Sequence, residues 1–91
     1  MKEAFKQYMI NNGYTQYTPK GLPSTVYDYL KRINFVCAQE NKTWLQLAEK
    51  IDLIVIKYDV GGTEEYLGNK SHRAVINALK RYQEFCHSEG I

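Results

Sequence analysis

The sequence has 91 residues, of which 44% are hydrophobic and 24% are charged, and it carries 12 basic against 10 acidic side chains. This length predicts one domain, residues 1–91, and the ordinary mixture of apolar and charged residues argues against intrinsic disorder. No apolar run reaches the roughly 20 residues of a membrane span, no secretory signal is visible, and the expected location is the cytoplasm. The formal net charge of +2 does not identify a partner, which only a local cluster of basic residues can do.

The first predicted helix covers residues 1–12. Phe5, Tyr8 and Met9 recur at the spacing of one helical face. Gly13 is expected to end this helix in the left-handed conformation that is common just after a helix. Residues 14–23 contain two prolines, a glycine and several polar residues, and they predict a loop.

The second predicted helix begins after Ser24, a favourable N-cap, and continues to about Glu40. Its apolar stripe steps by four, three and four residues, which is the pattern of an amphipathic helix. The stripe consists of Val26, Leu30, Ile33 and Cys37.

The third predicted helix opens with Thr43 and Gln46 at the spacing of a capping box. Asp52 is then expected to cap a short helix over residues 53–58. The β-branched run within that segment would also suit a strand, but no partner strand is visible elsewhere in the chain. We therefore prefer a helix, which the following glycine pair at residues 61–62 should end.

The last predicted helix begins at Asn69 or Ser71, after a turn-like stretch, residues 63–68, that can form a single helical turn. Gly90 should close it. Its apolar stripe consists of Val75, Ala78, Leu79, Tyr82, Phe85 and Cys86. The predicted fold class is therefore all-α, a compact bundle of four to five helices without a sheet.

The sequence contains no recognisable catalytic set. His72 and His87 lie at opposite ends of the last helix, about 22 Å apart at the helical rise of about 1.5 Å per residue, and cannot share a metal ion. No phosphate-binding loop or metalloprotease motif is present. Cys37 and Cys86 lie among apolar residues and are expected to be buried free thiols. We expect no enzyme, no catalytic residue, no cofactor and no metal site.

The informative pattern is the placement of basic residues on two helices. Arg73, Asn77, Lys80 and Arg81 can share one face of the last helix, and Lys31 and Arg32 lie on the polar side of the second. Together with Lys70 they form a candidate surface for DNA phosphates, or else an ordinary solvated face. The amides at the predicted start of the last helix, together with Lys70, would attract a phosphate; an ordinary capped helix start is the alternative.

Three segments resemble the N-terminal core-binding domain of tyrosine recombinases, the phage integrases, which has a SAM-like helical fold. They are Ser24–Cys37, Thr43–Leu47 and Ser71–Phe85. In the last segment the family pattern matches Arg73, Ala78, Leu79, Lys80, Tyr82 and Phe85. The resemblance covers the chain from about residue 5 to residue 85.

This resemblance implies a non-catalytic module that clamps one face of double-stranded DNA and contacts its backbone more than its bases. It implies DNA contacts from Lys31, Arg32, Lys70, Arg73, Asn77 and Arg81, to which the shared helical face adds Lys80. In the family a catalytic recombinase domain closes the other side of the DNA, so such a domain or another protein is an expected partner. Tyr82 belongs to the apolar stripe and is not expected to be a nucleophile.

The alternative is a small protein-protein interaction domain with no nucleic-acid role. In that interpretation a surplus of tyrosines forms the contact patch, because tyrosine is enriched at the centres of protein interfaces. These residues are Tyr14, Tyr17, Tyr27, Tyr29 and Tyr66.

Overall fold

The structure, a computed structural model, describes residues 1–91. The chain forms six helices and no strand: α1 (Lys2–Asn11), α2 (Thr25–Glu40), α3 (Trp44–Glu49), α4 (Ile51–Tyr58), α5 (Glu65–Gly68) and α6 (Lys70–Ser88). The predicted all-α class is confirmed, and the count exceeds four to five because residues 65–68 form a short helix of their own. None of the six helices combines the length and apolar content that crossing a bilayer requires.

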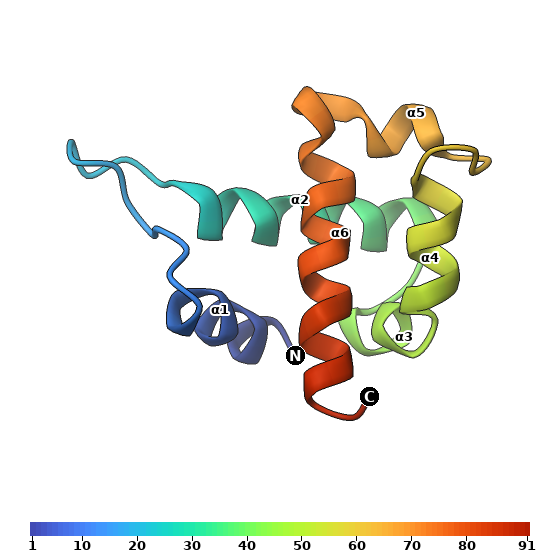
Figure 1. Ribbon diagram of the computed structural model, residues 1–91, viewed down its shortest axis with the longest axis horizontal. Coiled ribbons are helices and arrows are strands. Elements are labelled where there is room, and N and C mark those ends of the chain that lie inside the picture. The colour runs from blue at the N-terminus through green and yellow to red at the C-terminus, as the bar shows by residue number, and fades with distance from the viewer.

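Helix α1 has the predicted amphipathic character. Phe5 and Met9 are buried, and Tyr8 packs against the core from a half-buried position. Gly13 follows with φ of 88°, so it has the left-handed conformation predicted from the sequence. The loop beyond it projects away from the helices (Figure 1). An isolated antiparallel β-bridge between Tyr17 and Pro23 joins the two arms of this loop.

Helix α2 begins where the sequence predicts, but the predicted capping hydrogen bond is absent. Ser24 is extended, and its hydroxyl oxygen lies 2.9 Å from that of Thr15 instead of accepting from the helix amides. The serine therefore connects the projecting loop to the start of the helix. Asn41 ends α2 with φ of 53°, a left-handed conformation that asparagine tolerates better than most residues.

The predicted capping box at the start of α3 is confirmed. The Thr43 hydroxyl accepts from the amide of Gln46 at 3.1 Å, and the Gln46 side chain accepts from the amide of Thr43 at 2.9 Å. The strand alternative for the next segment is excluded, because α4 is helical from Ile51. Asp52 does not cap α4; it lies in the first turn, and its carboxylate accepts hydrogen bonds from α6 instead.

Helix α5 packs close against the end of α4 because Gly68 has no side chain. Any Cβ at this position would overlap the carbonyl oxygen of Tyr58. Gly62, in the connecting loop, approaches the carbonyl oxygen of Lys57 in the same way. The glycines after α4 thus end that helix, as predicted, and also permit the short return through α5.

The start of α6 differs from the prediction. Ser71, His72 and Arg73 have φ values of 53°, 57° and 68° and form a left-handed turn within the bounds of α6. Such a conformation costs roughly 1–2 kcal/mol per residue for residues other than glycine. Right-handed helical geometry is continuous only from Ala74 onward.

The predicted cap of α6 is therefore wrong. Asn69 makes no capping hydrogen bond, and its side-chain oxygen accepts from the Arg73 guanidinium at 2.8 Å. Ser71 lies inside the left-handed turn rather than before a right-handed helix. Neither of the two alternatives for the helix start at Lys70 and Ser71, a phosphate-attracting end or an ordinary capped end, is formed, since a right-handed helix does not begin there.

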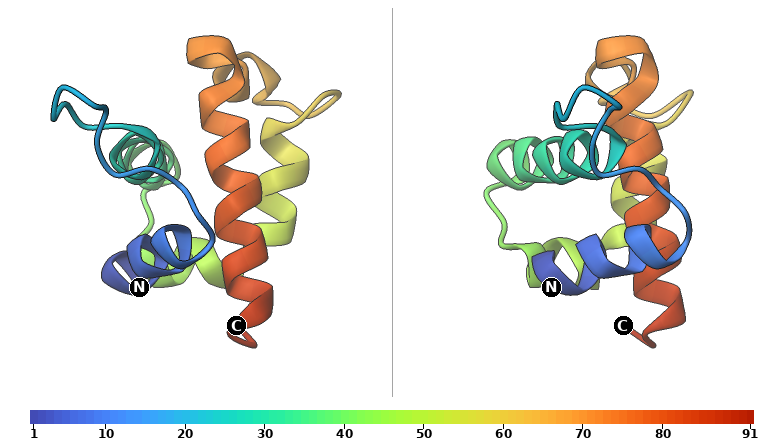
Figure 2. Two further views of the ribbon diagram at one scale, coloured as in Figure 1. Left: turned by 60° about the vertical axis from the view of Figure 1, so that its left-hand side comes forward. Right: turned by 90° about the vertical axis from the view of Figure 1, so that its left-hand side faces the viewer.

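Helix α6 runs through the middle of the molecule and crosses α2, with α4 and α5 on its other side (Figures 1 and 2). Every buried residue except Gly68 is apolar, and all of these join one connected cluster. The whole predicted stripe of the last helix is buried. Phe5 of α1 lies 5.1 Å from Tyr82 and 5.6 Å from Phe85, measured between ring centroids, and so attaches α1 to α6.

Candidate nucleic-acid interface

Arg81 lies where α6 crosses α2, close to two aromatic residues. Its guanidinium donates to the hydroxyl of Tyr14 at 3.4 Å and forms an ion pair with Glu84 at 2.9 Å. The hydrogen bond to Tyr14 is the main reason why the pKa of Arg81 is raised. The side chain is 31% exposed, so the charge is held in place but remains accessible from solvent.

Tyr29 connects Arg81 to the charged residues of α2. Burial raises the pKa of Tyr29, and the charges of Arg81 and Asp28 both act on its hydroxyl. Asp28 in turn forms an ion pair with Arg32 at 3.1 Å, one helical turn away. Tyr29 is therefore close to Arg81 of α6 and to Asp28, the ion-pair partner of Arg32.

Asp59, just after α4, holds two further cations of the predicted site. Its carboxylate lies 3.4 Å from the guanidinium of Arg73 and 3.1 Å from the ammonium of Lys80. A hydrogen bond from the amide of Val60, followed by the contact with Lys80, lowers the pKa of Asp59 below its ordinary value. Arg73 and Lys80 are therefore brought together by a carboxylate that belongs to neither helix of the predicted surface.

Lys70 and Asn77 occupy the same region without a carboxylate partner. The Lys70 ammonium lies 5.3 Å from the ring centroid of Phe35 on α2, a cation-π contact between the two helices. Asn77 is exposed and its side chain makes no hydrogen bond, although helical spacing places it on the same side of α6 as Lys80 and Arg81.

Lys31 is separated from the rest of the predicted site. Arg32 pairs with Asp28, whereas Lys31 forms no ion pair. Lys31 lines a hollow between α1 and α2, together with Lys2 and Lys6. Of the seven predicted residues, Lys70 contacts α2 through Phe35 and Arg81 contacts Tyr14 in the projecting loop. Arg73 and Lys80 pair with Asp59 at the end of α4, and Lys31 lines the hollow beside α1.

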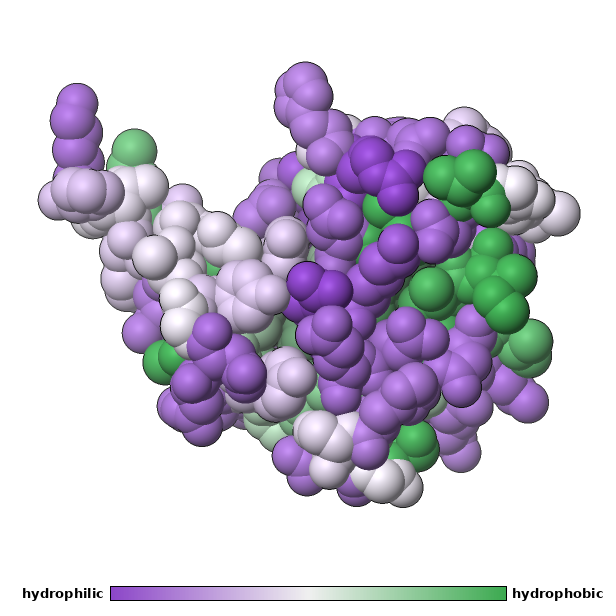
Figure 3. All heavy atoms as spheres, in the orientation of Figure 1, coloured by the Kyte–Doolittle hydropathy of each residue, from purple (hydrophilic) through white to green (hydrophobic).

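We call this surface the α2–α6 face. It comprises Arg32, Lys70, Arg73, Asn77, Lys80 and Arg81, together with the carboxylates of Asp28, Asp59 and Glu84. Its five cations outnumber its three carboxylates. The space-filling view is predominantly hydrophilic along α6 (Figure 3).

The pairing of these three carboxylates with the cations is not part of the site predicted from the sequence. Asp28 precedes Arg32 by four residues and Glu84 follows Arg81 by three, which are the spacings of helical ion pairs and could have been recognised. Asp59 lies far from its partners in sequence, so only the folded chain brings it to them.

The tyrosines of the alternative interpretation do not form one patch. Tyr17 and Tyr27 are paired, with 5.4 Å between ring centroids, and Tyr14 packs near Tyr29 at 6.1 Å. Tyr66 is exposed on α5, on another part of the molecule. These aromatic side chains chiefly attach the projecting loop to α2.

A different apolar surface is exposed on α4. Leu53, Ile56 and Val60 are 65%, 67% and 70% exposed, and hydrophobic atoms gather on this side of the molecule (Figure 3). Because α4 is apolar on nearly all sides, its outer face stays uncovered after its inner face has joined the core.

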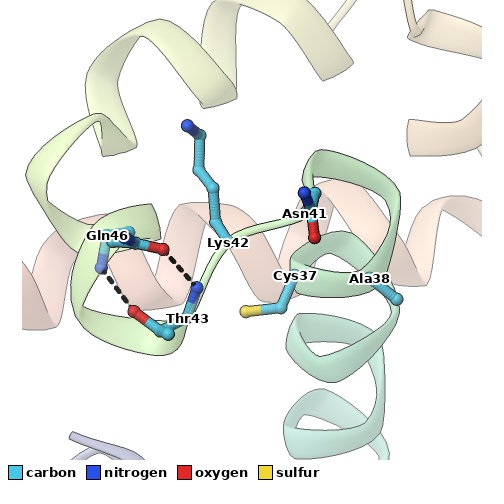
Figure 4. Close-up of a pocket in the computed structure, with 6 residues that line it drawn as sticks. All are labelled: Cys37, Ala38, Asn41, Lys42, Thr43 and Gln46. Carbon is cyan, nitrogen blue, oxygen red and sulfur yellow. Dashed lines mark hydrogen bonds between the residues drawn. The ribbon is translucent and has the colours of Figure 1, made fainter.

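A hollow of about 420 Å³ lies at the turn from α2 to α3 (Figure 4). Its polar groups include Thr43 and Gln46, which are already engaged in the capping box. Cys37 is a buried free thiol, as predicted, and burial raises its pKa. Burial likewise raises the pKa of the buried free thiol of Cys86 to about 11. Neither cysteine has the lowered pKa of an activated nucleophile.

Comparisons with known proteins found no match to this chain: no protein-family model, no curated protein and no solved structure. The resemblance to the core-binding domain of tyrosine recombinases stays a prediction that rests on the sequence segments quoted above.

Proposed function

We propose that the protein is a non-catalytic, SAM-like module that binds the backbone of double-stranded DNA through the α2–α6 face, in the cytoplasm. The observation that supports this proposal is that α2 and α6 carry five partly exposed cations, which outnumber the three carboxylates that pair with them. Phosphate contacts from arginine and lysine supply most of the sequence-independent affinity for DNA.

The ion pairs on this face do not prevent phosphate binding. Arg73, Lys80 and Arg81 remain 41%, 37% and 31% exposed, and ion pairs at such positions contribute only about 0–1 kcal/mol. A DNA phosphate can therefore replace or join a carboxylate at modest cost. The pairs also hold the long side chains near the surface, which reduces the entropy lost when DNA binds.

The salt dependence of duplex binding tests this proposal. The affinity for a DNA duplex should fall steeply as the salt concentration increases. In a plot of the logarithm of the association constant against the logarithm of the salt concentration, Arg73→Ala should reduce the slope by about one unit. Lys50→Ala is the matched control, because it removes one positive charge from an exposed position at the junction of α3 and α4. Fluorescence anisotropy at several salt concentrations gives both slopes.

Two results would contradict the proposal: no duplex binding at low salt, or equal slopes for Arg73→Ala and Lys50→Ala. The alternative function, a protein-interaction domain, is favoured by the exposed apolar residues Leu53, Ile56 and Val60 rather than by the tyrosines. A domain that binds only protein leaves the anisotropy of the duplex unchanged at every salt concentration, so the same titration separates the two functions.

A further inference from the structure

A second cationic surface lies in the hollow between α1 and α2. This hollow has a volume of about 350 Å³. Two helices supply its lining, with lysines on both walls: Lys2, Glu3 and Lys6 from α1, and Tyr27, Leu30, Lys31 and Asn34 from α2. Lys31 and Tyr27 also line a smaller neighbouring hollow, together with Asp28 of the α2–α6 face.

The lysines of this hollow differ from the arginines of the α2–α6 face in being unpaired. None of Lys2, Lys6 and Lys31 forms an ion pair, whereas Arg32, Arg73 and Arg81 each do. Glu3 is the only carboxylate among the lining residues. Three unpaired ammonium groups around one concave surface produce a local positive potential that attracts an anion.

The hydroxyl of Tyr27 adds a hydrogen-bonding group to the wall of the hollow. The ammonium of Lys6 lies 5.1 Å from the ring centroid of Tyr27, and the hydroxyl oxygens of Tyr27 and Tyr17 are 3.2 Å apart. Hydrogen bonding with Tyr17 and then with Lys6 lowers the pKa of Tyr27. Lys6 and Tyr27 therefore connect the two walls of the hollow, and Tyr17 of the projecting loop contacts Tyr27 from outside its lining.

We propose that the hollow between α1 and α2 is a second binding site, which binds closely spaced phosphate groups. Lysine ammonium groups are common phosphate ligands. Three of them suit a ligand with several negative charges better than they suit a ligand that carries one carboxylate. A free polyphosphate and an unpaired nucleic-acid strand share this chemistry. The proposal does not rest on duplex binding, because none of the lysines of the hollow belongs to the α2–α6 face. Lys31 is the one lysine of the hollow that the sequence also predicts to contact DNA.

Inorganic tripolyphosphate is the direct probe, titrated at low salt by calorimetry. We expect one binding site, and about tenfold weaker binding for Lys6→Gln and for Lys31→Gln, one on each wall. Lys50→Gln, which also removes one exposed unpaired lysine, is expected to bind like the parent protein. Arg73→Ala should also retain tripolyphosphate binding, so failure of the duplex proposal and failure of this one are distinguishable.

The single tryptophan provides an independent readout. The indole N–H of Trp44 donates to the side-chain oxygen of Asn34 at 2.8 Å, and Asn34 lines the hollow. Binding should therefore change the emission of Trp44 in the parent protein and not at the same concentration in Lys6→Gln. Unchanged circular dichroism spectra would show that both lysine variants remain folded.

A second titration with an oligothymidine strand identifies the source of the phosphates. Loss of binding in both lysine variants for either probe supports the proposal and assigns the ligand to that probe. The proposal is overturned if neither probe binds the parent protein, or if both lysine variants bind as tightly as Lys50→Gln.

Discussion

Tyr82 illustrates how one side chain of α6 can contribute both apolar packing and a specific hydrogen bond. Its ring is fully buried and lies 5.3 Å from that of Trp44, measured between centroids. Its hydroxyl donates to the carbonyl oxygen of Trp44 at 2.7 Å. Burial is the main reason why the pKa of Tyr82 is raised, so the group remains a neutral donor at physiological pH.

Replacement of this hydroxyl should cost stability without affecting the fold. Tyr82→Phe leaves a partly buried carbonyl without its donor, which we expect to lower the free energy of unfolding by about 1–2 kcal/mol. Tyr8→Phe is the control, since the Tyr8 hydroxyl makes no hydrogen bond and its loss should change stability by less than about 0.5 kcal/mol. Urea unfolding of both variants measures the difference, and equal stabilities would contradict the assigned role.

At the same scale, the sequence predicts some charged contacts and not others. The partners of Arg32 and Arg81 follow from helical spacing, because Asp28 and Glu84 lie one turn away on the same helix. The joint contact of Asp59 with Arg73 and Lys80 depends on where α4 ends relative to α6. No local sequence pattern encodes that arrangement. The sequence alone therefore does not predict that a carboxylate partly neutralises Arg73 and Lys80.

Among the elements, the left-handed turn at the start of α6 is the most unusual. Three consecutive residues other than glycine have positive φ, although the sequence offers no glycine to relieve the strain. The turn redirects the chain between α5 and the right-handed part of α6 and places Arg73 against both Asn69 and Asp59. It follows that α5 is positioned by backbone conformation as well as by packing.

Glycine in the left-handed turn should stabilise the protein. His72 is exposed and makes no side-chain hydrogen bond, so His72→Gly chiefly relieves the backbone and is expected to raise the free energy of unfolding by about 1 kcal/mol. Asn77→Gly, in the right-handed part of α6, should instead lower it by about 0.5 kcal/mol. Thermal unfolding measures both, and a loss of stability in His72→Gly would contradict the strain assigned to the left-handed turn.

The helices differ in how well the sequence predicts where they begin. The apolar stripes of α1, α2 and α6 recur at helical spacing, and the capping box fixes the start of α3, so these elements are predicted well. The starts of α4 and α6 are not, because they depend on contacts with distant residues. Asp52, for example, accepts from Gln83 on α6 at 2.9 Å instead of capping α4.

At the scale of the whole molecule, the central position of α6 separates surfaces of different character. The α2–α6 face carries arginines that are held by carboxylates, and the hollow between α1 and α2 carries unpaired lysines. The exposed apolar residues of α4 lie on the other side of α6 (Figures 1 and 3). The small net charge of the chain therefore conceals two local excesses of positive charge.

If the α2–α6 face binds DNA as proposed, Asp59 moderates that binding, because its carboxylate engages two of the cations. Asp59→Asn should free Arg73 and Lys80 and increase the affinity for a DNA duplex at low salt by about threefold. Asp52→Asn is the matched control, because it removes the same charge near the last turns of α6, where His87 and Gln83 are its partners. We expect tighter binding for Asp59→Asn than for Asp52→Asn; equal affinities, or no duplex binding by any variant, would contradict the proposal.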